Sequence, residues 1–480
     1  MPASVAGKLL LLLACLTGAT VIRAAAWFPP PTNGERIVIV APHPDDEALG
    51  CGGLIQQAVA AGADVRVIYL TNGDHNQIAF KLYSGHLLHL SPKDYIKFGE
   101  RRRLEATAAT TLLGLPPSSL IFLGYPDWGE LRIWRDYWAT NTVFTSDATR
   151  TNSVPYPEEY GYRHAYQPQS VTADLCAVLR DFKPARVFVT HPSDANSDHR
   201  ATANFVRLAL LQLAEEGLQP KLYFYVIHFG DWPRPAHYHP ELGLAPPPRL
   251  VDNGDWMALP LSPAQVETKY TAILANVTQT ATREFYLVSF ARTNELFAAI
   301  APDRVPVLPA GPEPDWRQAV RAKLLTIIPE ETYQQTDPLA GPAAPTTAPL
   351  EAIDFARQNG DLLVFVGLRN RFGKHTGVHL TLFPYQRCVP FETMPKVAIN
   401  IPPFGEFHVL VNGLPVRDAG VTVISVGNRF IVRVPMRVLG GKTIDHLFAA
   451  AQAHFGGIAA DDTAWQLLEL PVENERHNHD

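Results

Sequence analysis

The first half of the chain alternates between short apolar runs and longer stretches with helical spacing, and this alternation limits the possible folds. Strand-type runs lie at 37–41, 64–70, 120–123, 186–190 and 221–228, and helical patterns lie at 48–61, 97–113, 171–182 and 199–216. Alternation of this kind predicts an α/β fold with a mostly parallel, Rossmann-like sheet and helices on both faces. In such sheets, ligands bind beyond the carboxyl ends of the strands.

Two long excursions interrupt the pattern, at 77–95 and at 128–168, and the second is rich in aromatic residues. Long loops in a compact domain are usually functional or disordered, and the aromatic residues favour ordered loops that line a cleft. Further helices are predicted at 263–284 and 287–299, where the α/β pattern fades.

The second half of the chain has a different texture. A proline-rich passage at 336–349 is followed by short alternating runs, separated by turn signals such as Asn412-Gly413. Many short strands of this kind predict an all-β antiparallel sandwich domain. We expect the sandwich at 350–472, preceded at 301–349 by a proline-rich linker or by the start of the second domain, and followed by a solvated tail at 473–480.

Residues 1–26 have the pattern of a secretory signal peptide, because Lys8 precedes an apolar run and small residues at 24–26. The run is too short for a stable membrane anchor. An ordinary N-terminal helix is the plain alternative. A second alternative is a lipoprotein leader, since the residues before Cys15 resemble a lipoprotein cleavage site. The chain is therefore expected to be exported, periplasmic or extracellular, with membrane attachment only if Cys15 is lipidated.

Composition argues against a nucleic-acid-binding protein and against a small disulfide-bonded protein. Lys and Arg number 41 against 47 Asp and Glu, so the sequence has no basic footprint for nucleic acid. Outside the leader only Cys51, Cys176 and Cys388 remain, which is no disulfide framework and contains no CxxC pair for zinc. We expect these cysteines to be small buried residues. The sequence does not predict an oligomeric state.

Two polar clusters follow predicted strands, one around 43–47 and the other at 190–202 (THPSDANSDHRAT). His43 and Asp46 offer an imidazole and a carboxylate at a spacing that can turn both toward one point. A catalytic zinc site needs three protein ligands and one open position, and the second cluster offers His199, with His191 nearer the strand end. Asp45 is suited to remove a proton from a zinc-bound water, whose hydroxide can attack a carbonyl. We expect Asp198 to orient the His199 imidazole.

Simpler interpretations exist for each motif. A single His-x-x-Asp loop is more often a surface turn than a metal site, although two clusters at strand ends weaken that interpretation. The glycines at 50, 52 and 53 do not match GxGxxG, and the acidic run before them would repel a pyrophosphate. Close packing of a helix on the sheet explains these glycines better.

The stretch PHPDDEALGCGG at 42–53 resembles the signature of the PIG-L/LmbE-like deacetylases, zinc enzymes that remove acetyl groups from N-acetylglucosamine-type sugars. TNGD at 71–74, RRLEA at 102–106, GYPD at 124–127 and the stretch ending in DHR at 198–200 are similar to further motifs of that family. The resemblance implies a deacetylase domain at about 34–300.

By position, the resemblance implies His43, Asp46 and His199 as Zn²⁺ ligands and Asp45 as the general base. It also implies that Arg102 and Asp127 contact sugar hydroxyls. From the residues alone, Arg102 would be a helix-surface charge and Asp127 a turn residue.

The sequence departs from the family at the closing motif. Many members have His-Pro-Asp-His where this chain has Asn196-Ser197-Asp198-His199. Asn196 can donate a hydrogen bond but cannot deliver a proton. Either Asp45 acts as both base and acid, or His191 supplies the missing function.

The sequence therefore favours an exported zinc-dependent N-deacetylase whose partner is an acetylated amino sugar or glycan. An amidase or esterase with a non-sugar acyl substrate and a non-catalytic glycan-binding protein are the alternatives. The C-terminal domain resembles carbohydrate-binding modules only weakly. Tyr385, Phe391 and Trp465 would form either a sugar platform or, as we prefer, part of the core.

Overall fold

The computed structural model describes residues 26–85, 90–139, 141–230, 232–311, 314–321, 350–369, 376–455 and 458–471. Most of the predicted leader (1–25), much of the proline-rich passage (322–349) and the predicted tail (473–480) lie outside the described residues. Among the described residues, no helix is both long and apolar enough to cross a bilayer.

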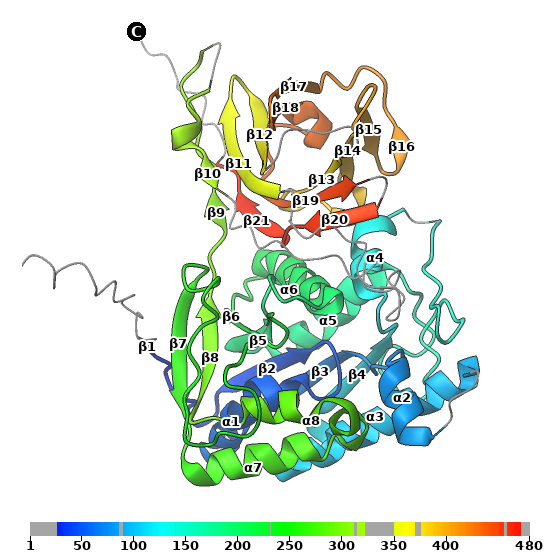
Figure 1. The fold of residues 1–480 in the computed structure, drawn as a ribbon, viewed down its shortest axis with the longest axis vertical. Helices are drawn as coiled ribbons and strands as arrows, with labels where there is room; N and C mark the ends of the chain where they lie inside the picture. The colour runs from blue at the N-terminus through cyan, green and yellow to red at the C-terminus, as the bar shows by residue number, and fades with distance from the viewer. Residues whose placement is uncertain are drawn as a thin grey trace, which may run out of the picture.

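The N-terminal part is built on an eight-stranded mixed sheet with the order β1-β7-β8-β6-β5-β2-β3-β4 (Figure 1). Its strands are β1 (Ala26–Trp27), β2 (Arg36–Ala41), β3 (Asp64–Thr71), β4 (Leu120–Tyr125), β5 (Arg186–Thr190), β6 (Lys221–Tyr225), β7 (Asp255–Pro260) and β8 (Asn294–Ala299). Strands β6, β5, β2, β3 and β4 are paired in parallel, whereas β8 is antiparallel to both of its neighbours. The prediction of a mostly parallel sheet in an α/β domain is therefore confirmed.

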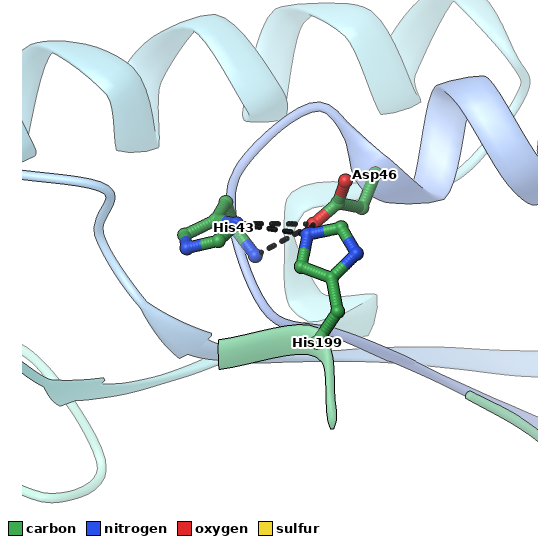
Figure 2. A group of neighbouring side chains, drawn as sticks. All are labelled: His43, Asp46 and His199. Carbon is green, nitrogen blue, oxygen red and sulfur yellow. Dashed lines mark hydrogen bonds and ion pairs between the residues drawn. The ribbon is translucent and has the colours of Figure 1, made fainter. Parts of the chain in front are cut away.

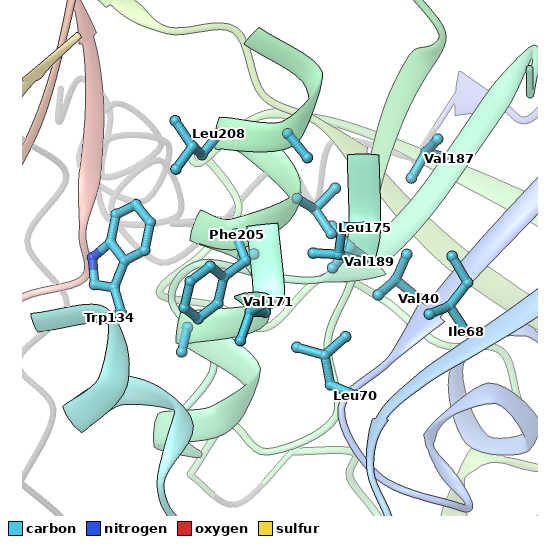
Figure 3. Close-up of a cluster of buried hydrophobic side chains, with 14 of the residues drawn as sticks. Val40, Ile68, Leu70, Trp134, Val171, Leu175, Val187, Val189, Phe205 and Leu208 are labelled. Carbon is cyan, nitrogen blue, oxygen red and sulfur yellow. The ribbon is translucent and has the colours of Figure 1, made fainter. Parts of the chain in front are cut away.

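Helices cover both faces of this sheet. They are α1 (Asp46–Ala60), α2 (Gln77–Ser84), α3 (Pro92–Leu112), α4 (Glu130–Asp136), α5 (Pro168–Phe182), α6 (Ser197–Glu215), α7 (Pro263–Leu274) and α8 (Val277–Leu287). Val40 of β2 points into the core under α5 and α6, which Figure 3 shows, and Val38 belongs to the same core. Ile37 and Ile39 point into the core under α1, α3 and α7. Successive strand residues point to opposite faces, so one apolar strand supplies both cores.

Three predictions about this part are corrected. The predicted helix at 287–299 is wrong, because α8 ends at Leu287 and Asn294–Ala299 is strand β8, inserted between β7 and β6. The predicted helix at 263–284 is two helices, α7 and α8, with a break at residues 275–276. The two excursions are not loops throughout, since they contain α2 and α4. Tertiary pairing, which a local pattern does not report, decides such segments.

The C-terminal part contains two further sheets, antiparallel except where β21 meets β9. One has the order β10-β11-β12-β18-β17, with β10 (Val320–Arg321), β11 (Leu350–Gln358), β12 (Asp361–Leu368), β17 (Thr422–Val426) and β18 (Arg429–Pro435). The other contains β9 (Asp303–Arg304), β13 (Thr376–Tyr385), β14 (Val397–Ile401), β15 (His408–Val411), β16 (Leu414–Pro415), β19 (His446–Phe455), β20 (Ile458–Asp462) and β21 (Gln466–Glu469). Because β9 pairs with β21, the C-terminal sheets already begin at Asp303.

Two predictions about buried side chains have clear outcomes. Tyr385, Phe391 and Trp465 are 2%, 0% and 4% exposed, so they pack in the core and form no sugar platform. Cys51 and Cys176 are buried as predicted, but Cys388 is exposed, which corrects the expectation for that residue.

Candidate metal centre

The two polar clusters meet at the carboxyl ends of neighbouring strands. His43 follows β2, His199 lies in the first turn of α6 after β5, and β2 pairs in parallel with β5. The chain runs from β2 to β3 and β4 on one side and returns to β5 on the other side. A reversal of strand order of this kind leaves a crevice beyond the strand ends.

Three side chains from these clusters converge on one point, as Figure 2 shows. His43 Nδ1 lies 3.2 Å from His199 Nε2 and 3.4 Å from Asp46 Oδ2, and His199 Nε2 lies 3.2 Å from Asp46 Oδ2. Three atoms bound at about 2.0–2.1 Å to a tetrahedral zinc ion are separated by about 3.3 Å. The donor set of two nitrogens and one oxygen, and its spacing, therefore fit a zinc ion.

The second nitrogen of each histidine faces a carboxylate. His43 Nε2 lies 3.2 Å from Asp127 Oδ1 and 3.4 Å from Asp198 Oδ2, and His199 Nδ1 lies 3.2 Å from Asp194 Oδ2. Carboxylates in this position fix the tautomer and the orientation of a metal-binding imidazole. The expectation that Asp198 orients His199 is wrong. Its carboxylate accepts hydrogen bonds from Trp128 N and Glu130 N and so points toward His43.

Electrostatics favour a cation at this point. Burial alone would lower the pKa of His199, but Asp46 and Asp194 raise that pKa to about 10. Burial would raise the pKa of Asp46, but His199 holds it well below its usual value. The surrounding carboxylates therefore favour a positive charge at this point, which a metal ion would supply.

Asp45 lies beside the ligands without being one of the converging groups. Its backbone has φ 130°, and its side chain makes no capping hydrogen bond to α1 although it stands at the N-cap. Non-glycine residues in such conformations often occur at functional sites. Burial raises the pKa of Asp45 to about 7, against the opposing charge of Arg102, whose Nη2 lies 3.5 Å from Asp45 Oδ1. The carboxylate is therefore poised for proton transfer near neutral pH.

Arg102 and Asp127, the expected sugar contacts, hold the site together. Arg102 is 4% exposed and donates to Gly73 O at 2.9 Å and to Pro44 O at 2.7 Å, so it joins the loops after β3 and β2. Gly73 has φ +61°, and a Cβ there would lie 1.7 Å from the guanidinium. Asp127 also accepts from His75 N at 2.8 Å. Contact of either side chain with a substrate stays a prediction.

Asn196 and His191 have structural partners. Asn196 caps α6, because its Oδ1 accepts from Asp198 N at 2.8 Å and from His199 N at 3.4 Å. Asparagine is among the preferred N-cap residues, and here it fixes the start of the helix that carries a ligand. His191 is fully buried, its ring stacks on Trp256 and its Nδ1 accepts from Ser193 N. His191 is thus packed inside the protein, and its catalytic role stays a prediction.

Two residues near the centre were not predicted. Asp194 contacts His199 and also accepts from Ile227 N and His228 N at 3.0 Å each. The partly exposed His228 follows β6, and its ring centroid lies 5.0 Å from that of His199 and 5.8 Å from that of Tyr286. Both residues stand at strand ends, which is the only signal the sequence offers for them.

Comparison with known proteins finds a family that this region resembles. Residues 38–210 match the family model PIG-L, described as GlcNAc-PI de-N-acetylase. This segment is similar to the PIG-L family. It contains His43, Asp46 and His199, so the predicted resemblance to PIG-L deacetylases is confirmed for this part of the chain.

Curated relatives carry the names of deacetylases. The chain is 32% identical over 206 residues to a 1D-myo-inositol 2-acetamido-2-deoxy-alpha-D-glucopyranoside deacetylase of Mycobacterium sp. (strain KMS), which covers 40% of this chain and 54% of that protein. The protein of the same name from Rhodococcus opacus (strain B4) is 31% identical over 34% of this chain and 48% of its own length. The chain thus spans about half the length of these relatives.

Among solved structures, the chain is similar to the N,N'-diacetylchitobiose deacetylase from Pyrococcus horikoshii. The TM-score is 0.34 at 19% sequence identity, and the alignment covers 55% of this chain and 82% of that one.

Proposed function

We propose that this protein is a zinc-dependent deacetylase that removes an N-acetyl group from an amino sugar or glycan. The observation that carries the proposal is the convergence of His43 Nδ1, Asp46 Oδ2 and His199 Nε2 beside a fourth polar residue, Asp45, that is not needed as a ligand. The PIG-L domain and the names of the relatives support a deacetylase and an acetylated amino sugar as the substrate class.

In this proposal His43, Asp46 and His199 hold the metal. A zinc ion held there would supply a Lewis acid for the amide carbonyl and would make the attacking water more acidic. Asp45 would take a proton from the attacking water and return it to the nitrogen of the leaving amine, because its pKa of about 7 suits both steps near neutral pH. The products are acetate and a free amino sugar.

Asp45 serves as both base and acid because the other two candidate residues have structural roles. Asn196 caps α6 and has no proton to give, and His191 is packed against Trp256. Arg102 keeps Asp45 near the ligands through its bonds to Pro44 and Gly73.

The test combines metal analysis with an acetate-release assay on the full chain. We expect about one zinc ion per chain and release of acetate from N-acetylglucosamine compounds. Asp45→Asn should keep the zinc and lose about 10²–10⁴-fold in kcat, the usual contribution of a positioned acid–base group. Glu158→Gln is the matched control, because its side chain is 80% exposed and it should leave kcat unchanged.

Other outcomes would point elsewhere. Unchanged turnover in Asp45→Asn would refute the assigned base. Hydrolysis of non-sugar amides or esters in preference to sugar amides would indicate an amidase or esterase. Glycan binding that survives removal of the metal, without hydrolysis, would indicate a binding protein.

We further infer that the chain is exported and divided as the sequence suggests. The leader pattern at 1–26 supports export, with lipidation at Cys15 as the variant that would attach the protein to a membrane. A shared core with residues from β11, β12 and β18 on one side and β13, β14 and β19 on the other supports a β-sandwich after residue 303. Detection of the mature N-terminus by mass spectrometry would test the export proposal.

A further inference from the structure

A buried aromatic cluster joins the PIG-L domain to the C-terminal sheets. We call it the aromatic seam, and its members are Trp134, Trp138, Phe383, Phe391, Phe448 and Trp465. Trp134 of α4 is fully buried at its centre. Its ring centroid lies 5.1 Å from Phe448 of β19 and 5.7 Å from Trp465. Large aromatic side chains dominate the energetics of such contacts, so the seam holds α4 firmly against the C-terminal sheets.

The same short helix reaches the metal centre at its other end. Trp128 N donates to Asp198 Oδ2 at 2.6 Å and Glu130 N donates to Asp198 Oδ1 at 3.1 Å. Asp198 Oδ2 in turn lies 3.4 Å from His43 Nε2. Asp127, the second carboxylate on His43, is in the turn just before α4. The position of α4 therefore determines both carboxylates that face the Nε2 of His43.

The C-terminal sheets also hold the helix that carries the other histidine. Helix α6 begins at Ser197, and the Nη1 of Arg200 lies 3.4 Å from Asp462 of β20. At the far end of α6, Glu215 accepts hydrogen bonds from Tyr385 OH and from Cys388 N. Phe205, in the middle of α6, packs against Trp134 at 5.1 Å between ring centroids, and Figure 3 shows the two rings side by side.

We propose that the C-terminal sheets are part of the metal centre's support, and that Trp134 is the positioning residue through which they act. Packing of Trp134 in the aromatic seam fixes α4, α4 fixes Asp127 and Asp198, and these carboxylates fix the His43 imidazole. The inference rests on the proposed metal site. It gives the C-terminal part a task in the reaction without any contact with substrate.

The test compares three variants of the full chain. Trp134→Ala removes the anchor. Trp134→Phe keeps a six-membered aromatic ring and loses the pyrrole part of the indole with its N–H, for which the described residues provide no hydrogen-bond partner. Phe355→Ala is the matched control, because Phe355 is 1% exposed in the core between the two C-terminal sheets and is not a member of the aromatic seam.

The readouts are zinc affinity by chelator competition, the visible absorption spectrum of the Co²⁺-substituted protein, and kcat and KM. Trp134→Ala should bind zinc about 10–100-fold more weakly, since loss of a partner that orients a ligand has that effect. Its Co²⁺ spectrum should change and its kcat should fall more than its KM rises. Trp134→Phe should restore most of the zinc affinity and of the Co²⁺ spectrum. Phe355→Ala should lose thermal stability but keep the zinc affinity and the Co²⁺ spectrum. All assays are run below the unfolding transition of each variant.

The outcomes separate this inference from the proposed function. A wild-type chain that binds no zinc would overturn the proposed function and this inference with it. Wild-type zinc affinity and Co²⁺ spectrum in a folded Trp134→Ala, or the same losses in Phe355→Ala, would overturn only the inference. If Trp134→Ala does not fold, Phe448→Leu, which thins the aromatic seam from the β19 side, should give the same direction of change.

Discussion

Asp194 shows how much one buried carboxylate can organise. It lies 3.2 Å from the Nδ1 of His199 and accepts from the backbone of Ile227 and His228, so it ties the end of β5 to the segment after β6. The charge of His199 lowers the pKa of Asp194 although burial would raise it. The residue therefore stays ionised and holds the imidazole with Nε2 toward the metal position.

We predict that Asp194→Asn binds zinc about 10–100-fold more weakly, the usual effect of removing a carboxylate that orients a metal-binding histidine. The amide keeps the shape of the side chain but loses its charge. Zinc affinity from chelator competition is the measurement. Asp181→Asn is the control, because Asp181 is exposed on α5. Equal affinity in Asp194→Asn and wild type would contradict the role given to Asp194.

At the scale of elements, helix α1 depends on its glycines. A Cβ at Gly50 would lie 2.3 Å from the ring of Tyr225, and one at Gly53 would lie 2.2 Å from Leu261. Only a residue without a side chain allows α1 to lie this close to β6 and to the segment after β7. The prediction that the glycines serve close helix–sheet packing is confirmed for Gly50, which faces Tyr225 of β6.

We predict that Gly50→Ala destabilises the protein by about 1–3 kcal/mol, because overpacking forces the buried Tyr225 ring to move. Gly52→Ala is the control in the same helix. Its Cβ would meet the flexible Lys269 side chain at 3.2 Å, and alanine favours the helix by up to about 1 kcal/mol over glycine. Urea unfolding curves of both variants measure the difference. A Gly50→Ala protein as stable as Gly52→Ala would show that α1 can shift freely.

At the scale of the whole molecule, a buried lysine lies at the aromatic seam. The Nζ of Lys396 lies 4.1 Å from the ring centroid of Phe391 and 4.9 Å from that of Trp138, and it donates to Met394 O at 2.9 Å. Burial lowers the pKa of Lys396 to about 7, against the opposing charge of Glu392. An unfolded chain would hold the same proton up to a pH of about 10.4.

The stability of the protein should therefore rise with pH above neutrality. Between pH 7 and about 10 the unfolded state binds a proton that the folded state has lost, so the free energy of unfolding increases with pH. Lys396→Met should flatten this rise, by an amount on the order of a few kcal/mol. Lys442→Met, at an exposed position, should leave the slope unchanged. Urea unfolding at pH 7 and pH 9.5 measures the change in the free energy of unfolding with pH. The same change in wild type and in Lys396→Met would contradict the prediction.

Much of this protein can be predicted from its sequence, for physical reasons. In an apolar run such as Ile37–Ile39, successive side chains point to opposite faces of the sheet, so both faces must be covered by helices. The pattern itself therefore predicts an α/β fold. Parallel strands bring their carboxyl ends to one edge, so His43 and His199 can be predicted to meet although 155 residues separate them.

The tertiary structure decided the rest. Asn294–Ala299 is a strand because it pairs antiparallel with β7 and β6, between which it lies. A local sequence pattern does not report such pairing. The partners of a buried side chain depend on packing. Asp198 therefore faces His43 rather than His199. Arg102 is buried and donates hydrogen bonds to two loops instead of lying on a helix surface. The aromatic seam joins α4 to strands more than 200 residues away, and only the folded chain brings Trp134 to Phe448.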